Sequence, residues 1–272
     1  MPDFKNLFIV LFSFIFGQAF SQKSFDLTVS LDSSINSKNV SCYYDDGIDN
    51  ILVKDTFVNN ILKLKADFHS KFVSFRIDYD NKNGKSLSNT FFIDGRPATI
   101  HFTGRLKINE SQLAYDSIKN ALPVFDTATN KIWKELSIYI QKQTQAISDF
   151  WEKYGSEIGK SDSITHLNQK LFRSLNDRSI QFLRNYSNDY FSFWFFREEI
   201  LRPSVVFMSK DTNYMKNLLF SFNTTFPISY TESFEGQNVI KKLKGLIKAN
   251  ERNRKAPIFF NKRYCWKSGK SK

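Results

Sequence analysis

Cysteine and histidine are scarce in this chain of 272 residues. The sequence holds two cysteines, Cys42 and Cys265, and three histidines, His69, His101 and His166. Two cysteines exclude a disulfide scaffold, and their spacing leaves open whether they pair in an oxidising compartment. A zinc site needs about four converging N, S or O ligands, and no such spacing occurs. We therefore interpret the histidines as scattered structural or surface residues.

Motifs of common catalytic and nucleotide-binding sites are also missing. There is no Gly-rich phosphate loop, no G-x-S-x-G elbow and no H-E-x-x-H helix. Together with the scarcity of cysteine and histidine, this absence leads us to expect no catalytic residues, no cofactor and no metal ligands. The chain is not expected to be an enzyme.

No apolar run is long enough to cross a membrane. The run Leu7–Phe16 has ten residues, whereas a membrane-spanning helix needs roughly 20. It follows Lys5 and precedes a small-x-small pattern, as in a signal peptide cleaved after Ser21. The alternative is a buried core helix. We expect a signal peptide at residues 1–21, a periplasmic or secreted protein, and no transmembrane segment.

Acidic residues are rare at the C-terminal end. Residues 241–272 hold twelve Lys or Arg and one acid, Glu251, and so carry +11 of the net charge of +12. The rest of the chain is nearly neutral, so we expect no nucleic-acid partner. A weak contact of the basic tail with an anionic surface remains open, and it would be sensitive to salt.

Two groups of acidic residues invite a functional interpretation. Asp45, Asp46 and Asp49 do not match the ligand spacing of an EF-hand loop, so a hairpin turn is favoured over a calcium site. Glu198 and Glu199 are adjacent, and adjacent side chains on a helix do not face each other. A solvated helix end is therefore favoured over an acid pair.

Aromatic residues make up 16% of the chain. They are densest in one block, which could be a platform for sugars or bases but is more often helix core: Phe191, Phe193, Trp194, Phe195 and Phe196. We expect core. The apolar content of 41% is enough for one large or two small domains.

The first part of the chain shows the period-2 alternation of strands. From Phe25 to about Ile108, about seven short apolar segments are separated by turn residues such as Asp94-Gly95. This predicts an antiparallel β-sandwich or partly open barrel over residues 22–108. The fold class is therefore α+β, with the strands first.

From about Asn109 the apolar period becomes helical. Apolar stripes predict helices over Ile132–Tyr154 and over Leu167–Tyr186, the second capped by Ser163. The remaining expected helices are Tyr190–Leu201, which stops at Pro203, Asp211–Phe222 and Gln237–Ala249. We assign residues 109–250 to a helical connector and residues 251–272 to a basic tail that we expect to be disordered.

This order of segments resembles the N-terminal region of TlpA/ResA-like thiol–disulfide oxidoreductases. The resemblance lies in these segments: Asp55-Thr56-Phe57-Val58, Phe91-Phe92-Ile93-Asp94-Gly95, Ala98-Thr99-Ile100-His101-Phe102-Thr103-Gly104, Phe226-Pro227 with Gly236, and Ala256-Pro257-Ile258-Phe259. In that family a β domain of unknown function and a connector precede a thioredoxin-like domain, which opens with A-P-x-F. The resemblance implies an envelope protein related to enzymes that reduce or exchange disulfides with a cysteine pair.

The chain departs from the family after Ala256-Pro257. Instead of W-C-x-x-C it has Cys265-Trp266-Lys267-Ser268, with one cysteine, so no redox residue carries over. With AT-leaning codons, a one-base shift in Asn261–Lys272 gives a peptide similar to the family's next strand and turn, which suggests a frameshift. We expect a truncated, catalytically inactive form of an AhpC/TlpA-like oxidoreductase with an unknown envelope partner. The alternative is a stand-alone binding module for a protein, peptide or glycan.

Overall fold

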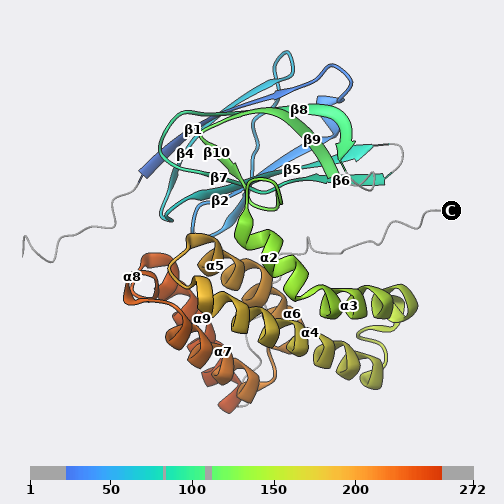
Figure 1. Ribbon diagram of the computed structural model, residues 1–272, viewed down its shortest axis with the longest axis vertical. Helices are drawn as coiled ribbons and strands as arrows, with labels where there is room; N and C mark the ends of the chain where they lie inside the picture. The colour runs from blue at the N-terminus through green and yellow to red at the C-terminus, as the bar shows by residue number, and fades with distance from the viewer. Residues whose placement is uncertain (1–22, 82–83, 108–111, 253–272) are drawn as a thin grey trace, which may run out of the picture.

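The chain folds into a strand region followed by a helical region (Figure 1). The computed structural model describes residues 23–81, 84–107 and 112–252. The expected signal peptide, Cys265 and the tail from residue 253 onward lie outside the described residues. The predicted α+β class, with strands first, is confirmed.

The strand region is one mixed, curled sheet of ten strands. Along its main path the order is β10-β7-β5-β6-β9-β8-β1-β4, and the β2–β3 hairpin pairs with β5. Most pairs are antiparallel, whereas β1–β8 and β6–β9 are parallel. The strands are β1 (Lys23–Leu31), β2 (Val40–Asp45), β3 (Asn50–Leu52), β4 (Ile61–Phe68), β5 (Val73–Asn81), β6 (Gly84–Ser88), β7 (Phe91–Ile93), β8 (Ala98–Lys107), β9 (Gln112–Lys119) and β10 (Ala121–Pro123).

Alternation along the strands builds the first of two apolar cores. In β1 the side chains of Phe25, Leu27, Val29 and Leu31 are buried, and the intervening residues are more exposed. A similar pattern in β4, β8 and most of β5 adds much of this core, which includes the fully buried Phe68, Phe75 and Phe102. One face of each strand is thus removed from water, as the sequence predicted.

The sheet extends further along the chain than the sequence indicated. Three strands were missed, β6, β9 and β10, so the sheet ends at Pro123 rather than near Ile108, and the first helix begins at Lys131, one residue before the expected Ile132. The expectation failed because β9 pairs with β8 across two register shifts. In β9 the adjacent Leu113 and Ala114 are both buried, which breaks the period-2 pattern. β6 and β10 are too short to show a period.

The helices form a second layer below the sheet in the view of Figure 1. They are α2 (Lys131–Tyr139), α3 (Gln141–Tyr154), α4 (Asp162–Leu183), α5 (Tyr190–Phe195), the π-helix η4 (Phe196–Leu201), α6 (Arg202–Met208), α7 (Thr212–Thr225), α8 (Ile228–Thr231) and α9 (Phe234–Glu251). None of the described helices is both long and apolar enough to span a membrane.

Three expected helix boundaries were wrong. The helix expected over Ile132–Tyr154 is two helices, α2 and α3, which meet at Ile140. The apolar spacing continues across the break because both helices pack on α4. Ser161, not Ser163, caps α4 by accepting the N–H of Ile164. Pro203 does not end the aromatic helix, because it lies in the first turn of α6, where a missing N–H is tolerated.

The aromatic block forms the centre of the second core. The predicted core role is confirmed, since each member of the block is at most 6% exposed. Phe92 of β7 belongs to the same core, and its ring lies 5.4 Å from that of Trp194 in an edge-to-face arrangement. The strand and helical regions are therefore joined by a shared apolar seam.

Candidate functional site

A largely buried group of charged side chains, together with one tyrosine, lies where the β2–β3 hairpin meets the helices. We call Asp45, Tyr190, Arg197, Glu198, Arg202 and Glu235 the charge cluster. Arg197 is at its centre, with a side chain that is 11% exposed. Its guanidinium contacts Asp45 at 3.1 Å, Glu198 at 3.0 Å and Glu235. One cation thus joins β2, η4 and α9.

Glu235 receives the most hydrogen bonds of the three carboxylates. Besides Arg197, it accepts the hydroxyl of Tyr190 at 2.9 Å and the backbone N–H of Lys71 at 3.3 Å. Glu198 is bound by Arg197 and also by Arg202, four residues further on. Asp45 accepts the N–H of Gly47 at 2.7 Å in addition to Arg197.

Local backbone geometry brings these residues together. Gly47 has φ +94°, and a Cβ there would lie 2.9 Å from Ser70, so the hairpin turn packs tightly on the β4–β5 connection. The N–H of His69 donates to the carbonyl of Asp46 at 2.7 Å, which also fixes the hairpin turn against the β4–β5 connection. On the helical side, Arg197 and Glu198 lie in the π-helix, a form often found at functional sites.

Burial and an excess of carboxylates shift the titration of the cluster. Burial raises the pKa of Asp45 to about 7; Glu198 adds to this, and Arg197, the Gly47 N–H and Arg202 oppose it. Burial also raises the pKa of Glu235, against Arg197 and Tyr190. The pKa of Glu198 is lowered, because Arg197 and Arg202 outweigh its burial.

The two acidic groups singled out in the sequence meet different outcomes. Asp45, Asp46 and Asp49 do form a hairpin turn, in which Asp46 accepts the N–H groups of Ile48 and Asp49. The solvated position expected for Glu198 and Glu199 is wrong for Glu198, whose side chain is 14% exposed and paired with two arginines, whereas Glu199 is exposed.

The three histidines lie in separate places. His69 packs on Phe234 with ring centroids 5.3 Å apart, His101 bonds Ser30 at 2.8 Å, and His166 is an exposed residue of α4. Within residues 23–81, 84–107 and 112–252, no group of His, Cys, Asp or Glu is arranged to hold a metal ion.

Cys42 is inside the strand region. It lies on β2, is 4% exposed and is a free thiol. Burial, and secondarily the charge of Asp78, raises the pKa of this thiol to about 12. A thiol must ionise to attack a disulfide, so Cys42 is poorly suited to redox chemistry.

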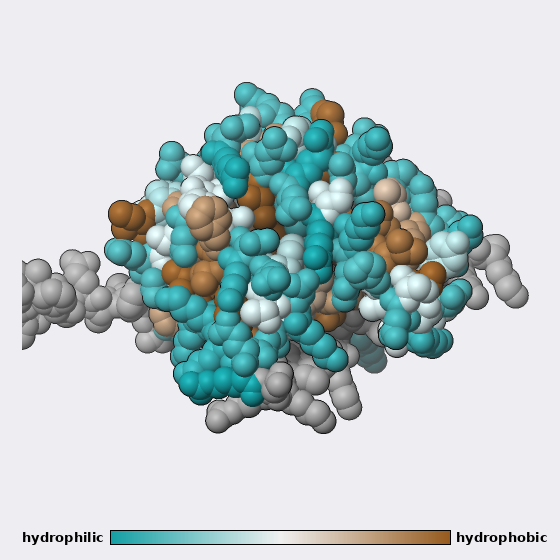
Figure 2. All heavy atoms as spheres, turned by 90° about the horizontal axis from the view of Figure 1, so that it is seen from below, coloured by the Kyte–Doolittle hydropathy of each residue, from teal (hydrophilic) through white to brown (hydrophobic). Residues whose placement is uncertain are grey.

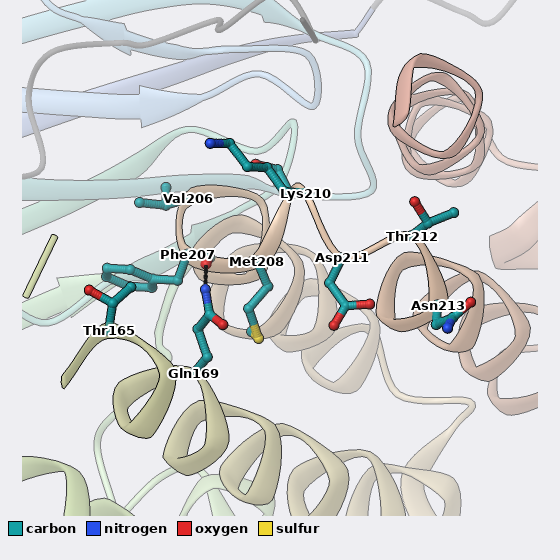
Figure 3. Close-up of a pocket in the computed structure, with 10 residues that line it drawn as sticks. Thr165, Gln169, Val206, Phe207, Met208, Lys210, Asp211, Thr212 and Asn213 are labelled. Atoms are coloured by element: carbon teal, nitrogen blue, oxygen red, sulfur yellow. Dashed lines mark hydrogen bonds between the residues drawn. The ribbon is translucent and has the colours of Figure 1, made fainter. Parts of the chain in front are cut away.

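An open pocket of ≈ 640 Å³ lies between α4 and the α6–α7 connection (Figure 3). Thr165 and Gln169 line one side and residues 206–213 the other, and Gln169 donates to the carbonyl of Phe207 at 2.8 Å. Its lining mixes apolar and polar side chains and includes Lys210 and Asp211. The pocket is open to solvent, and it was not foreseen from the sequence.

Exposed apolar side chains are scattered on the face at the helical end. Viewed from below, they form separate spots among hydrophilic residues (Figure 2). Five of the exposed large apolar residues are on the helices, namely Ile138, Leu167, Val206, Phe220 and Ile228. This face therefore does not present one continuous apolar docking surface.

Comparison with known proteins gives no family for the chain: no protein-family model, curated protein or solved structure matches it. The central residues of the charge cluster, Arg197 and Glu235, were missed by the sequence reasoning. The available signal was the run Arg197-Glu198-Glu199, placed between a buried aromatic block and apolar Ile200 and Leu201. Charges enclosed by core residues are rarely buried without partners.

Proposed function

We propose that the chain is an exported, catalytically inactive module, built like the N-terminal part of TlpA/ResA-like thiol–disulfide oxidoreductases. The order of a curled sheet followed by a helical region supports this proposal. The apolar core that the two regions share also supports it, because this core fixes the sheet and the helices against each other as one unit. The module's role is to bind or position an envelope partner.

The observation that carries the proposal is the state of Cys42. Thiol–disulfide exchange needs an accessible thiolate with a lowered pKa beside a resolving cysteine. Cys42 is 4% exposed, and its pKa is shifted in the opposite direction. A thiol in this environment is a small apolar core residue.

The reactivity of Cys42 tests this directly. In the full chain carrying Cys265→Ser, Cys42 should react with a thiol reagent at pH 8 roughly a thousandfold more slowly than in the unfolded chain, because few molecules hold the thiolate. A matched control places a cysteine at the exposed position 63 of β4, as Lys63→Cys with Cys42→Ala and Cys265→Ser. The control should react at the unfolded rate. Fast labelling of Cys42 in the native chain would refute the proposal.

A second candidate function, a ligand-binding module, is favoured by the pocket at the α6–α7 connection. One wall of the pocket is Phe207, whose ring lies 6.0 Å from that of Trp151. Oligosaccharides or short peptides that enter the pocket should change the tryptophan fluorescence in a saturable way. Val206→Arg should abolish the change, and Ile138→Arg, an exposed position on α2, should not. An absence of any saturable change would rule out this candidate.

A further inference from the structure

The exposed side of α9 carries a row of positively charged residues. Its members recur every three or four positions, and we call them the basic row: Lys241, Lys244, Lys248 and Arg252. Residues at this spacing lie on one face of a helix. The buried Val239 and Leu243 lie on the opposite face, in the second core. With a rise of 1.5 Å per residue, the basic row spans roughly 16 Å of the surface.

The acids of α9 do not neutralise the basic row. Glu235 is buried in the charge cluster and is bound by Arg197, and Glu251 pairs with Lys216 of α7 at 2.7 Å. Among residues 23–81, 84–107 and 112–252, no acid forms an ion pair with any member of the row. The sequence then continues with seven Lys or Arg and no acid in residues 253–272. Positive charge without partners is therefore concentrated at this surface.

An exposed aromatic ring lies on the neighbouring helix. α7 packs antiparallel to α9 (Figure 1), since Asn250 near the end of α9 donates to the carbonyl of Ser209, just before α7, at 2.7 Å. Lys216 and Glu251 pair where the two helices meet, and their side chains are 52% and 50% exposed. Phe220 is one turn further along α7 on the same face as Lys216, and it is 67% exposed. The surface of α7 and α9 thus combines a row of cations with an exposed ring.

We propose that this surface docks the protein on an anionic lipid membrane, with the basic row against the headgroups and Phe220 at their boundary with the acyl chains. A bilayer with acidic lipids presents spread negative charge above an apolar layer. The basic row matches the charge, and the exposed ring matches the apolar layer. Nucleic acid or an acidic protein would match the charge alone. The inference rests on the proposed role as an envelope module and names the lipid surface as its partner.

The charges set the size of the expected effect. A Lys or Arg close to an anionic membrane strengthens binding roughly fivefold. Neutralising two members of the basic row should therefore weaken binding roughly 25-fold. Salt screens the attraction, because the Debye length falls from about 10 Å at 0.1 M to about 3 Å at 1 M.

Co-sedimentation of the full chain with lipid vesicles is the test. The wild type should bind vesicles of equal parts phosphatidylglycerol and phosphatidylcholine, bind phosphatidylcholine vesicles far more weakly, and be released by added salt. Lys244→Gln with Lys248→Gln should weaken binding to the mixed vesicles roughly 25-fold. The matched control, Lys63→Gln with Lys65→Gln, removes the same charge from exposed positions of β4 in the sheet and should bind like the wild type.

Phe220→Ser tests the apolar part of the contact, because it leaves every charge in place. It should weaken binding to the mixed vesicles and leave binding to duplex DNA, a polyanion without an apolar layer, unchanged. The wild type should bind the mixed vesicles more tightly than duplex DNA at the same salt concentration.

Several outcomes would overturn the proposal. They are no binding to the mixed vesicles, equal effects of the two lysine pairs, no effect of Phe220→Ser, and tighter binding to duplex DNA than to vesicles. Equal effects would assign the contact to the overall charge or to residues 253–272, and tighter binding to DNA would make nucleic acid the partner. None of these measurements involves Cys42, so their failure is distinguishable from a failure of the proposed function, which thiol labelling tests.

Discussion

Arg197 is the side chain on which the charge cluster depends most. It neutralises carboxylates from β2, η4 and α9, which without it would be buried together. Removing one partner of a buried ion pair costs about 3–5 kcal/mol, because the other charges stay uncompensated. Arg197→Met should therefore lower the free energy of unfolding by about that amount at pH 7, measured by urea denaturation.

Arg184→Met is the matched control, because Arg184 is an exposed residue at the end of α4. The control should stay within about 0.5 kcal/mol of the wild type. Equal stability of the two variants would mean that Arg197 does not hold the charge cluster together.

For individual residues, the sequence predicted the burial of apolar side chains better than the burial of polar ones. The aromatic block was correctly placed in the core because five aromatic residues within six positions are rarely left in water. The burial of Glu198 and the role of Arg197 were not predictable, because both depend on a hairpin about 150 positions earlier in the chain.

At the scale of elements, helix α9 contains two glycines in opposite environments. A Cβ on Gly236 would lie 2.0 Å from the carbonyl oxygen of Tyr230, whereas a Cβ on Gly245 would meet nothing within 4 Å. Gly236→Ala must push the backbone of α8 away from α9, and we expect a loss of about 2–3 kcal/mol. Thermal and urea unfolding would measure it.

Gly245→Ala should instead stabilise the chain by about 0.5–1 kcal/mol, because alanine loses less backbone entropy than glycine in an exposed helix. The close approach explains the need for glycine at position 236. If both substitutions had the same effect, α8 and α9 would not be packed as described.

The elements that the sequence revealed are those with one regularly buried face. In β1 buried side chains alternate with more exposed ones from Phe25 to Leu31, and the strand pattern was expected to begin at Phe25. β9 was missed because two register shifts against β8 remove the alternation. The π-helix was also missed, since no residue pattern distinguishes it from the α-helices on either side.

For the whole molecule, the apolar seam predicts cooperative unfolding. The tryptophans among the described residues, Trp133, Trp151 and Trp194, are all in the helical region, and Phe92 of the sheet packs on Trp194. Tryptophan fluorescence and the exchange protection of β1 and β8 should therefore be lost at the same urea concentration. Two separate midpoints would show that the strand and helical regions are independent folding units.

The whole-molecule order of strands and then helices was readable from the change in apolar period. The junction between them was not, because a sequence pattern reports which face of an element is buried and not which element covers it. The contacts of Phe92 with Trp194 and of Asp45 with Arg197 each join two elements that no sequence pattern pairs with each other.

The central proposal is that Cys42, the cysteine among the described residues, takes no part in thiol–disulfide exchange. The most direct measurement is the reduction of insulin disulfides by the full chain in the presence of dithiothreitol, beside a thioredoxin as a positive control. The account predicts a rate equal to that of dithiothreitol alone, unchanged by Cys42→Ala, because Cys42 is buried with a raised pKa. A rate above that background, lost in Cys42→Ala, would contradict it.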